Sequence, residues 1–261
     1  MNCLVETALL THGLRSITNE ELAQSWHCPD AILAWVDRGE LKLGPIGEYL
    51  PFRERSEELI RIDCDHLEEA LQTGASGALT ASGTMAVCRR LDIPMAITCG
   101  MGGIGDLRGE ELCPDLPALM NIPVALISTS PKDMLDRPAT LDWLRRHGVH
   151  TAGEPCTGYL FCGEPVALEL PLSSCNNEAA VRRLTANGGL LLLNPIPEKE
   201  RVQDRSILVD AIKAGKQAEA EGHYYHPAAN GEIDRRTDGY SSRIQLESIQ
   251  QNYLLAKSIM D

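Results

Sequence analysis

The sequence has few aromatic residues and no long hydrophobic run. Aromatic side chains make up 4% of the 261 residues, so the core must be built mainly from aliphatic side chains. The longest apolar stretches, such as PMAIT and GLLLLN, are far shorter than the roughly 20 residues that a membrane-spanning helix needs. The N-terminal MNCLVETALLTHG lacks the basic start and the apolar run of a signal peptide. We therefore expect a cytoplasmic protein that makes no contact with a membrane.

Runs of positive charge are also missing. The formal net charge is −13 and the sequence pI is near 5.0. The densest basic groups are pairs such as Arg89-Arg90 and Arg145-Arg146. A protein that follows a nucleic-acid backbone needs a basic face to neutralise phosphates. The composition therefore argues against a nucleic-acid polymer as a partner, although a local cationic pocket could still bind a small anion.

Common metal and nucleophile motifs are absent. The nine cysteines are irregularly spaced and form no CxxC pair, which argues against a disulfide framework and a zinc ribbon. The histidines form neither an HxH nor an HExxH spacing, and GxSxG does not occur. His223 and His226 could touch a ligand, but we interpret residues 223–242 as a polar surface loop.

The sequence does contain a regular alternation of strand and helix patterns. Apolar runs such as IPMAIT, IPVALIS and LLLLN are typical of buried strands, and amphipathic segments such as TASGTMAVCRRLD and TLDWLRRHG lie between them. The segment SEELIRI also has helical periodicity, and helices are expected over 201–220 and 243–259. The pattern predicts a single α/β domain over 1–261, a three-layer α/β/α fold with a central, largely parallel sheet.

Ligands of such folds bind at the carboxyl ends of the strands. Four polar segments follow predicted strands, namely Thr11–Gly13, Thr98–Gly105, Ser128–Lys132 and Asn194–Glu198. The glycine-rich TCGMGGIGDLRG could let backbone amides approach a phosphate, but it matches neither GxGxxG nor the P-loop. These segments are where we expect the chemistry.

Lys132 and Glu6 are the candidate catalytic residues. Lys132 follows a buried strand near the start of a helical segment, where the helix dipole disfavours the ammonium form, and a Schiff-base nucleophile needs the neutral amine. Position alone favours a solvated surface lysine, because most lysines are exposed. Glu6 interrupts an apolar strand; if it faces a cleft, burial would raise its pKa towards the range useful for acid–base catalysis. The alternative is a solvated strand face.

Asp115 and Asn194 are candidate ligand-binding residues. Asp115 in ELCPDLPAL could cap a helix or bind a hard cation. Asn194 ends the strand LLLLN before Pro195 and Pro197. Its amide could contact sugar hydroxyls or merely open a turn.

Five ordered segments together resemble a known family. VETALLTHGL, LTASGTM, ITCGMGGIG, PDLPALMNIPVALISTSPKDMLDRPATLDWLRRHGV and LLLLNPIPEKE are similar to successive signatures of the pseudouridine-5'-phosphate glycosidase (indigoidine-synthesis-A-like) family. The similarity runs from about Cys3 to Glu200 and is most specific across Asp115–Val149.

The resemblance implies a C-glycosidase or C-glycosynthase that acts on C1' of ribose (5-phosphate) and a uracil-like ring. It also implies a homotrimer and a divalent manganese ion. Lys132 falls on the family's Schiff-base lysine, Glu6 on its general acid/base and Asp115 on its metal-linked aspartate. Substrate-binding positions are implied at Arg61, Thr80, Ala81, Thr98 and Asn194.

The sequence departs from the family near the glycine loop. The family's His-Arg-Gly becomes Asp106-Leu107-Arg108-Gly109, and the serine two residues before Asp115 becomes Cys113. Arg61 replaces a phosphate-binding lysine and changes the geometry of that charge. Alternatives therefore stay open: a C-nucleoside or C-glycoside biosynthetic enzyme with altered phosphate or ring specificity, a lysine-dependent lyase without a nucleobase, or a non-catalytic ligand-binding relative.

Overall fold

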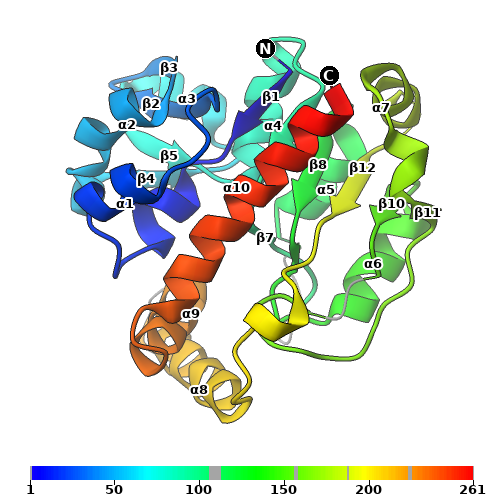
Figure 1. Ribbon diagram of the computed structural model, residues 1–261. Helices are drawn as coiled ribbons and strands as arrows, with labels where there is room; N and C mark the ends of the chain where they lie inside the picture. The colour runs from blue at the N-terminus through cyan, green and yellow to red at the C-terminus, as the bar shows by residue number, and fades with distance from the viewer. Residues whose placement is uncertain (1, 106–112, 156–157, 187, 223–224, 261) are drawn as a thin grey trace.

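The computed structural model describes residues 2–105, 113–155, 158–186, 188–222 and 225–260. In these residues a ten-stranded sheet runs through the molecule in the order β11-β10-β12-β8-β6-β1-β2-β5-β4, with β3 paired to β2, and a small second sheet joins β7 to β9 (Figure 1). The strands are β1 (Cys3–Val5), β2 (Leu33–Asp37), β3 (Glu40–Gly44), β4 (Ile60–Ile62), β5 (Gly77–Leu79), β6 (Met95–Ile97), β7 (Gly100–Met101), β8 (Ala125–Ser128), β9 (Ser130–Pro131), β10 (His150–Gly153), β11 (Leu170–Pro171) and β12 (Leu190–Leu193).

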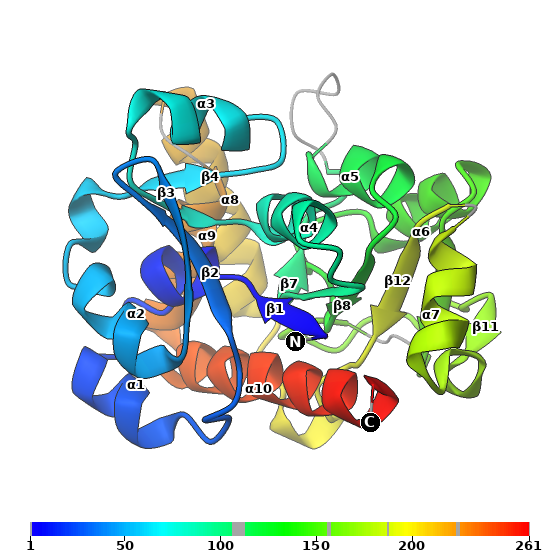
Figure 2. The same cartoon turned by 90° about the horizontal axis from the view of Figure 1, so that it is seen from above.

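Helices cover both faces of the central sheet. The α-helices are α1 (Asn19–Ser25), α2 (Ile46–Arg53), α3 (Leu67–Thr73), α4 (Ala81–Arg90), α5 (Asp115–Asn121), α6 (Arg137–Arg146), α7 (Glu178–Thr185), α8 (Ser206–Ala220), α9 (Tyr225–Arg236) and α10 (Tyr240–Met260). Short helical turns are η1 (Leu9–Gly13, a π-helix), η2 (Ser56–Glu58), η3 (Leu172–Cys175) and η4 (Glu198–Glu200). Seen from above, α4 and α5 lie on one side of the sheet and α10 on the other (Figure 2).

Alternation along the strands explains these layers. Leu4 on β1 packs into one core with the helices α3 to α6, whereas its neighbour Val5 packs into a second core with α1, α2 and α10. Leu4 aligns with Ala96 on β6, which faces the same core. Because successive strand residues point to opposite faces, a strand buried on both sides is apolar throughout. The three-layer α/β/α prediction is confirmed.

The prediction of a largely parallel sheet is also confirmed. Among the described strands β2 is antiparallel to β3 and β5, and the other pairs are parallel. The β2–β3 hairpin turns at Arg38 and Gly39, whose φ angles of 51° and 75° suit a tight two-residue turn. Thr18 caps α1, since its hydroxyl accepts from the Glu21 amide at 3.1 Å.

Three local predictions were wrong. SEELIRI contains η2 and the strand β4 rather than a helix, because Ile60–Ile62 pairs with β5 and tertiary pairing overrides the helical pattern. The first strand ends at Val5, and η1 follows where a loop was expected. The expected loop at 223–242 contains α9 over 225–236 and the start of α10, while residues 223 and 224 lie outside the described part.

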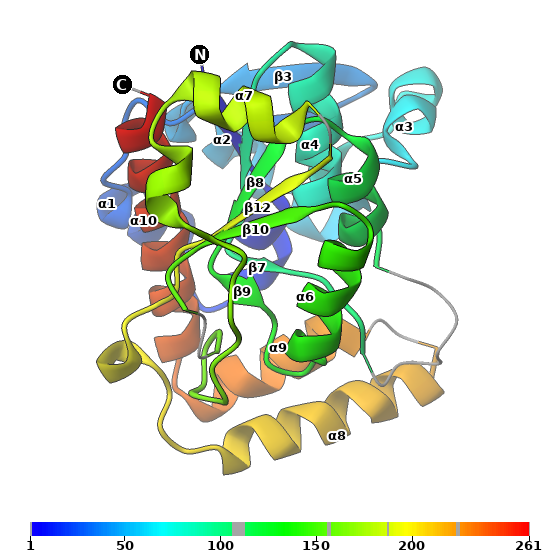
Figure 3. The ribbon, with the colours of Figure 1, turned by 90° about the vertical axis from the view of Figure 1, so that its right-hand side faces the viewer.

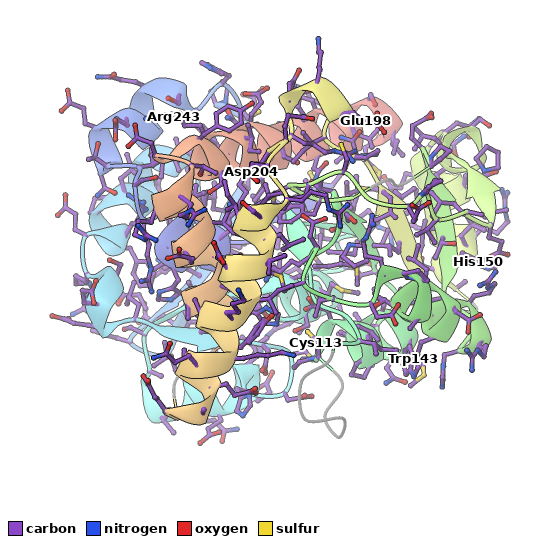
Figure 4. All side chains as sticks on the ribbon, turned by 90° about the horizontal axis from the view of Figure 1, so that it is seen from below. Cys113, Trp143, His150, Glu198, Asp204 and Arg243 are labelled. Carbon is purple, nitrogen blue, oxygen red and sulfur yellow. The ribbon has the colours of Figure 1, made fainter. Side chains whose placement is uncertain are left out.

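Helices α8 and α9 lie across the lower end of the molecule, where the parallel strands finish (Figure 3). Seen from below, both helices lie in front of the sheet (Figure 4). Helix α9 packs against η1, which follows β1. Within the described residues no helix is both long and apolar enough to cross a bilayer.

Candidate active site

A cavity lies at the carboxyl ends of the central strands. It brings together residues from both halves of the chain, namely Glu6, Ala8, Leu9, Gly13, Arg61, Thr80, Ala81, Gly100, Asp115, Lys132, Tyr159, Asn230 and Gln245. Six of the eight residues that the sequence singled out are in this set: Glu6, Arg61, Thr80, Ala81, Asp115 and Lys132. Sequence positions as distant as 6 and 132 therefore face a common space.

Lys132 is held by the small second sheet. Ser130 and Pro131 form β9, which pairs with β7 of the glycine-rich segment, and the Lys132 amide donates to the Met101 carbonyl at 3.2 Å. Burial lowers the pKa of the Lys132 ammonium below its usual range, and the nearby positive charge of Arg61 lowers it further. Both effects favour the neutral, nucleophilic amine.

Glu6 is buried just beyond the end of β1, with 6% of its surface exposed. Burial is the main reason that its pKa rises to about 7, and the negative charge of Asp115 acts in the same direction. Thr98 opposes this shift, because its hydroxyl donates to Glu6 Oε1 at 2.7 Å and stabilises the carboxylate. A carboxyl group that titrates near neutral pH can both give and accept a proton.

Asp115 is buried and both of its oxygens accept backbone hydrogen bonds. Oδ1 accepts from the Ser82 amide at 3.1 Å, and Oδ2 accepts from the Gly102 amide at 2.8 Å. Its side chain does not cap α5, its own helix. It instead satisfies an amide in the first turn of α4, where the helix dipole favours negative charge. The position of Gly102 is crowded, since a Cβ there would collide with the sulfur of Cys113.

Three of the predicted substrate-binding residues, Arg61, Thr80 and Ala81, line the cavity. Thr80 is the N-cap of α4 and accepts from the Gly83 amide at 3.3 Å, and Ala81 begins the helix. Arg61 comes from β4, and its positive charge lowers the pKa of Lys132. An arginine beside a helix N-terminus is a favourable environment for a phosphate.

Thr98 and Asn194 lie outside the set of residues that line the cavity, as far as the described chain shows. Thr98 acts on the site through its hydrogen bond to Glu6. The Asn194 amide donates to Asn252 Oδ1 at 3.0 Å, and Asn252 in turn donates to the Thr98 carbonyl at 2.7 Å. Asn194 is thus tied to α10 and reaches Glu6 only through this chain of hydrogen bonds.

The described residues do not fit a metal site. No group of three His, Cys, Asp or Glu side chains within them is arranged to hold an ion. Each oxygen of Asp115, the predicted metal-linked residue, accepts a hydrogen bond from one backbone amide. The altered segment Asp106-Leu107-Arg108-Gly109 lies outside the described residues. The implied manganese ion therefore enters no step below.

Three polar residues of the cavity were not predicted from the sequence. Tyr159 follows no recognisable motif, and Gln245 lies on the buried face of the predicted C-terminal helix. Asn230 lies on α9, which was interpreted as a loop. The signal for this helix was present, because the buried residues Tyr225, Ala229 and Ile233 recur every four positions.

Asp133 links the lysine segment to Tyr159. Its carboxylate accepts from the backbone amides of Tyr159 at 2.8 Å, Leu160 at 2.7 Å and Phe161 at 3.0 Å. We expect Asp133→Ala to lower the free energy of unfolding by about 3 kcal/mol or more, because three amides lose a charged partner. Urea denaturation would measure this loss. Asp30→Ala, which removes an exposed ion pair with Lys257, is the matched control; an equal effect of both changes would contradict the role of Asp133.

Comparison with known structures supports the fold. A crystal structure of the prealnumycin C-glycosynthase AlnA in complex with ribulose 5-phosphate matches with a TM-score of 0.77 and 22% identity, covering 98% of this chain and 91% of that one. An indigoidine synthase A-like protein from Thermotoga maritima matches with a TM-score of 0.76 and 19% identity, with the same coverage of both chains. Identities this low establish the fold alone.

Similar sequences extend over almost the whole chain. A pseudouridine-5'-phosphate glycosidase from Methylobacterium nodulans is 28% identical over 98% of this chain and 81% of its own length. A protein of the same name from Petrotoga mobilis is 26% identical over 98% of this chain and 89% of its own. The family model described as Indigoidine synthase A like protein matches residues 4–260, so this chain belongs to that family.

Proposed function

We propose that this protein is a C-glycosidase or C-glycosynthase. It cleaves or forms the bond between C1' of ribose 5-phosphate and a uracil-like ring through an imine on Lys132. The observation that carries the proposal is that Lys132 and Glu6 line one cavity and that burial moves both pKa values towards neutrality. The names of the relatives, pseudouridine-5'-phosphate glycosidases, support the choice of sugar and ring.

Cleavage of a carbon–carbon glycosidic bond cannot begin by protonating a glycosidic oxygen, so the two-carboxylate scheme of O-glycosidases does not apply. In our proposal Glu6 gives its proton to the sugar ring oxygen, and Lys132 bonds to C1' as that oxygen leaves. The C1'–ring bond then breaks; its electron pair stays with the ring carbon, which takes up a proton, and C1' becomes the imine carbon. One water hydrolyses the imine and releases ribose 5-phosphate.

Synthesis follows the same steps in reverse. The Lys132 amine condenses with the open-chain aldehyde and loses water, the ring carbon adds to the imine, and the sugar oxygen displaces the amine. Arg61 and the α4 N-terminus at Thr80 and Ala81 bind the phosphate. We also propose that the chain acts as a single domain over 1–261 within a homotrimer, which sedimentation analysis would test.

Covalent trapping tests the imine. The intact protein is incubated with borohydride and either ribose 5-phosphate or ribose, and its mass is measured. We expect an adduct with ribose 5-phosphate that maps to Lys132 by peptide analysis, and much less adduct with ribose because it lacks the anion for Arg61. No adduct with either sugar, or an adduct on another lysine, would refute the proposal. Product analysis with uracil then separates this reaction from a lyase that uses no nucleobase.

A further inference from the structure

Three polar residues that line the cavity come from the C-terminal part of the chain. Tyr159 comes from the segment after β10, Asn230 from α9 and Gln245 from α10, whereas Arg61 and Thr80, the proposed phosphate-binding residues, come from the first 80 residues. Figure 4 shows α9 and α10 from below, behind α8. The proposed reaction assigns no role to Tyr159, Asn230 or Gln245.

Two polar atoms on α9 are buried and unpaired. Asn230 Oδ1 and His226 Nδ1 are both covered and have no hydrogen-bond partner within the described residues. Positions 226 and 230 are four residues apart, so their side chains lie on the same face of the helix. An unpaired buried polar atom costs about 1–3 kcal/mol, and such atoms call for an explanation such as a ligand or ordered water.

The unpaired oxygen restricts what the ligand can be. A carboxamide oxygen only accepts hydrogen bonds, so its partner must carry an N–H or O–H group. A phosphate dianion has no such group. The same amide has an –NH2 that can donate to a neighbouring carbonyl, and a paired N–H and C=O edge matches both halves of an asparagine side chain. An imide or amide heterocycle has this edge.

His226 adds a buried, neutral polar group to the same face of α9 as Asn230. Burial lowers the pKa of its imidazole to about 3, and the positive charges of Lys132 and Arg61 contribute. The ring is therefore uncharged near neutral pH and offers one donor and one acceptor. His226 lies one turn before Asn230, which lines the cavity.

Tyr159 provides an aromatic side chain in the lining of the same cavity. Its ring packs on Gly100, where a Cβ would come within 2.6 Å of Cζ. The hydroxyl donates to Gln245 Oε1 at 3.0 Å and lies 3.1 Å from the sulfur of Cys99. These contacts fix the orientation of the ring and occupy its polar end, so its aromatic surface is what remains to pack against a flat ligand.

We propose that Asn230, with His226 one turn before it, binds the N–H/C=O edge of the heterocycle that leaves or joins C1', and that Tyr159 packs against its face. These residues are specificity determinants for the ring. The inference rests on the proposed C–C bond chemistry and extends it from the sugar to the ring.

Asn230→Leu removes the side-chain amide and leaves a side chain of similar size. We expect the KM for uracil in synthesis with ribose 5-phosphate to rise about ten-fold or more, from the loss of two hydrogen bonds. The wild-type protein should use uracil in preference to uracil that is methylated at its imide nitrogen, and the variant should lose this preference. Borohydride trapping of ribose 5-phosphate should not change. Asn230→Ala gives the same readout if the leucine variant is unfolded, and Arg235→Ala, on an exposed residue of α9, is the control.

Two outcomes would overturn the inference. In the first, a variant at Asn230 keeps the wild-type KM for uracil and the wild-type preference for uracil over the methylated ring. In the second, the variant traps less ribose 5-phosphate, which would place Asn230 at the sugar. Both outcomes presuppose that the wild type forms the lysine adduct. Failure of the wild type to form it would instead refute the proposed function, so the two failures are distinguishable.

Discussion

Replacing Lys132 by Ala should abolish turnover while the protein remains folded. The covalent route loses its nucleophile, and we expect kcat/KM to fall by at least about a thousand-fold. The loss should be in kcat, since Arg61 and Thr80 still bind the phosphate in the variant. Steady-state kinetics with uracil and ribose 5-phosphate, together with borohydride trapping, would measure both consequences.

Two further variants make this experiment specific. Lys132→Arg keeps the positive charge but cannot form the imine, because guanidinium stays protonated in proteins; it should be as inactive as the alanine variant. Lys199→Ala removes an exposed lysine, 83% of whose side chain is accessible, and should be indistinguishable from wild type. Substantial activity in Lys132→Ala would rule out the imine.

The central layers were predictable because their sequence patterns are strong. The strands β6 and β12 are apolar throughout, and β8 is apolar up to Ser128 at its end. Amphipathic helices separate these strands, a pattern that few folds other than layered α/β structures accommodate. The short edge strand β4 was not predictable from the sequence. Ile60 and Ile62 belong to a segment with helical periodicity, and they form a strand because they pair with β5. Local pattern does not contain that tertiary pairing.

The candidate site was predictable where residues follow strands directly. Glu6 and Lys132 come at or near strand ends, and parallel strands bring their carboxyl ends to one edge. Asn194 also follows a strand, yet its side chain turns to Asn252 on α10. The position of a helix packed across the sheet cannot be read from the spacing of the strands. The same limit applies to Asn230, whose helix was not recognised.

Glu6 should control the pH dependence of cleavage. Its pKa of about 7 means that the proton-donating form is lost as the pH rises through 7, so kcat should fall there. The Thr98 hydrogen bond stabilises the carboxylate and holds this pKa down. Thr98→Val should therefore raise it, by about one unit or more if the hydrogen bond contributes about 1.5 kcal/mol. A pH–rate profile would show the falling limb at higher pH; an unmoved limb would contradict the assignment of Glu6.

Glu6→Gln separates the catalytic role from a structural one. Removing the proton donor should reduce kcat by about 10²–10⁴.

The same substitution should increase the stability of the folded protein above neutral pH. The folded pKa, about 7, lies above the reference value of 4.5, so the stability that the buried acid contributes is complete below pH 4.5 and is lost as the pH rises through 7. The difference of about 2.5 units corresponds to roughly 3 kcal/mol, a charge-burial cost that glutamine avoids. We expect the variant to be more stable than wild type at pH 8 and similar at pH 4.5 in urea denaturation. A variant that is inactive and also less stable at pH 8 would mean that Glu6 supports the fold, because a residue kept for catalysis at the expense of stability must show both effects together.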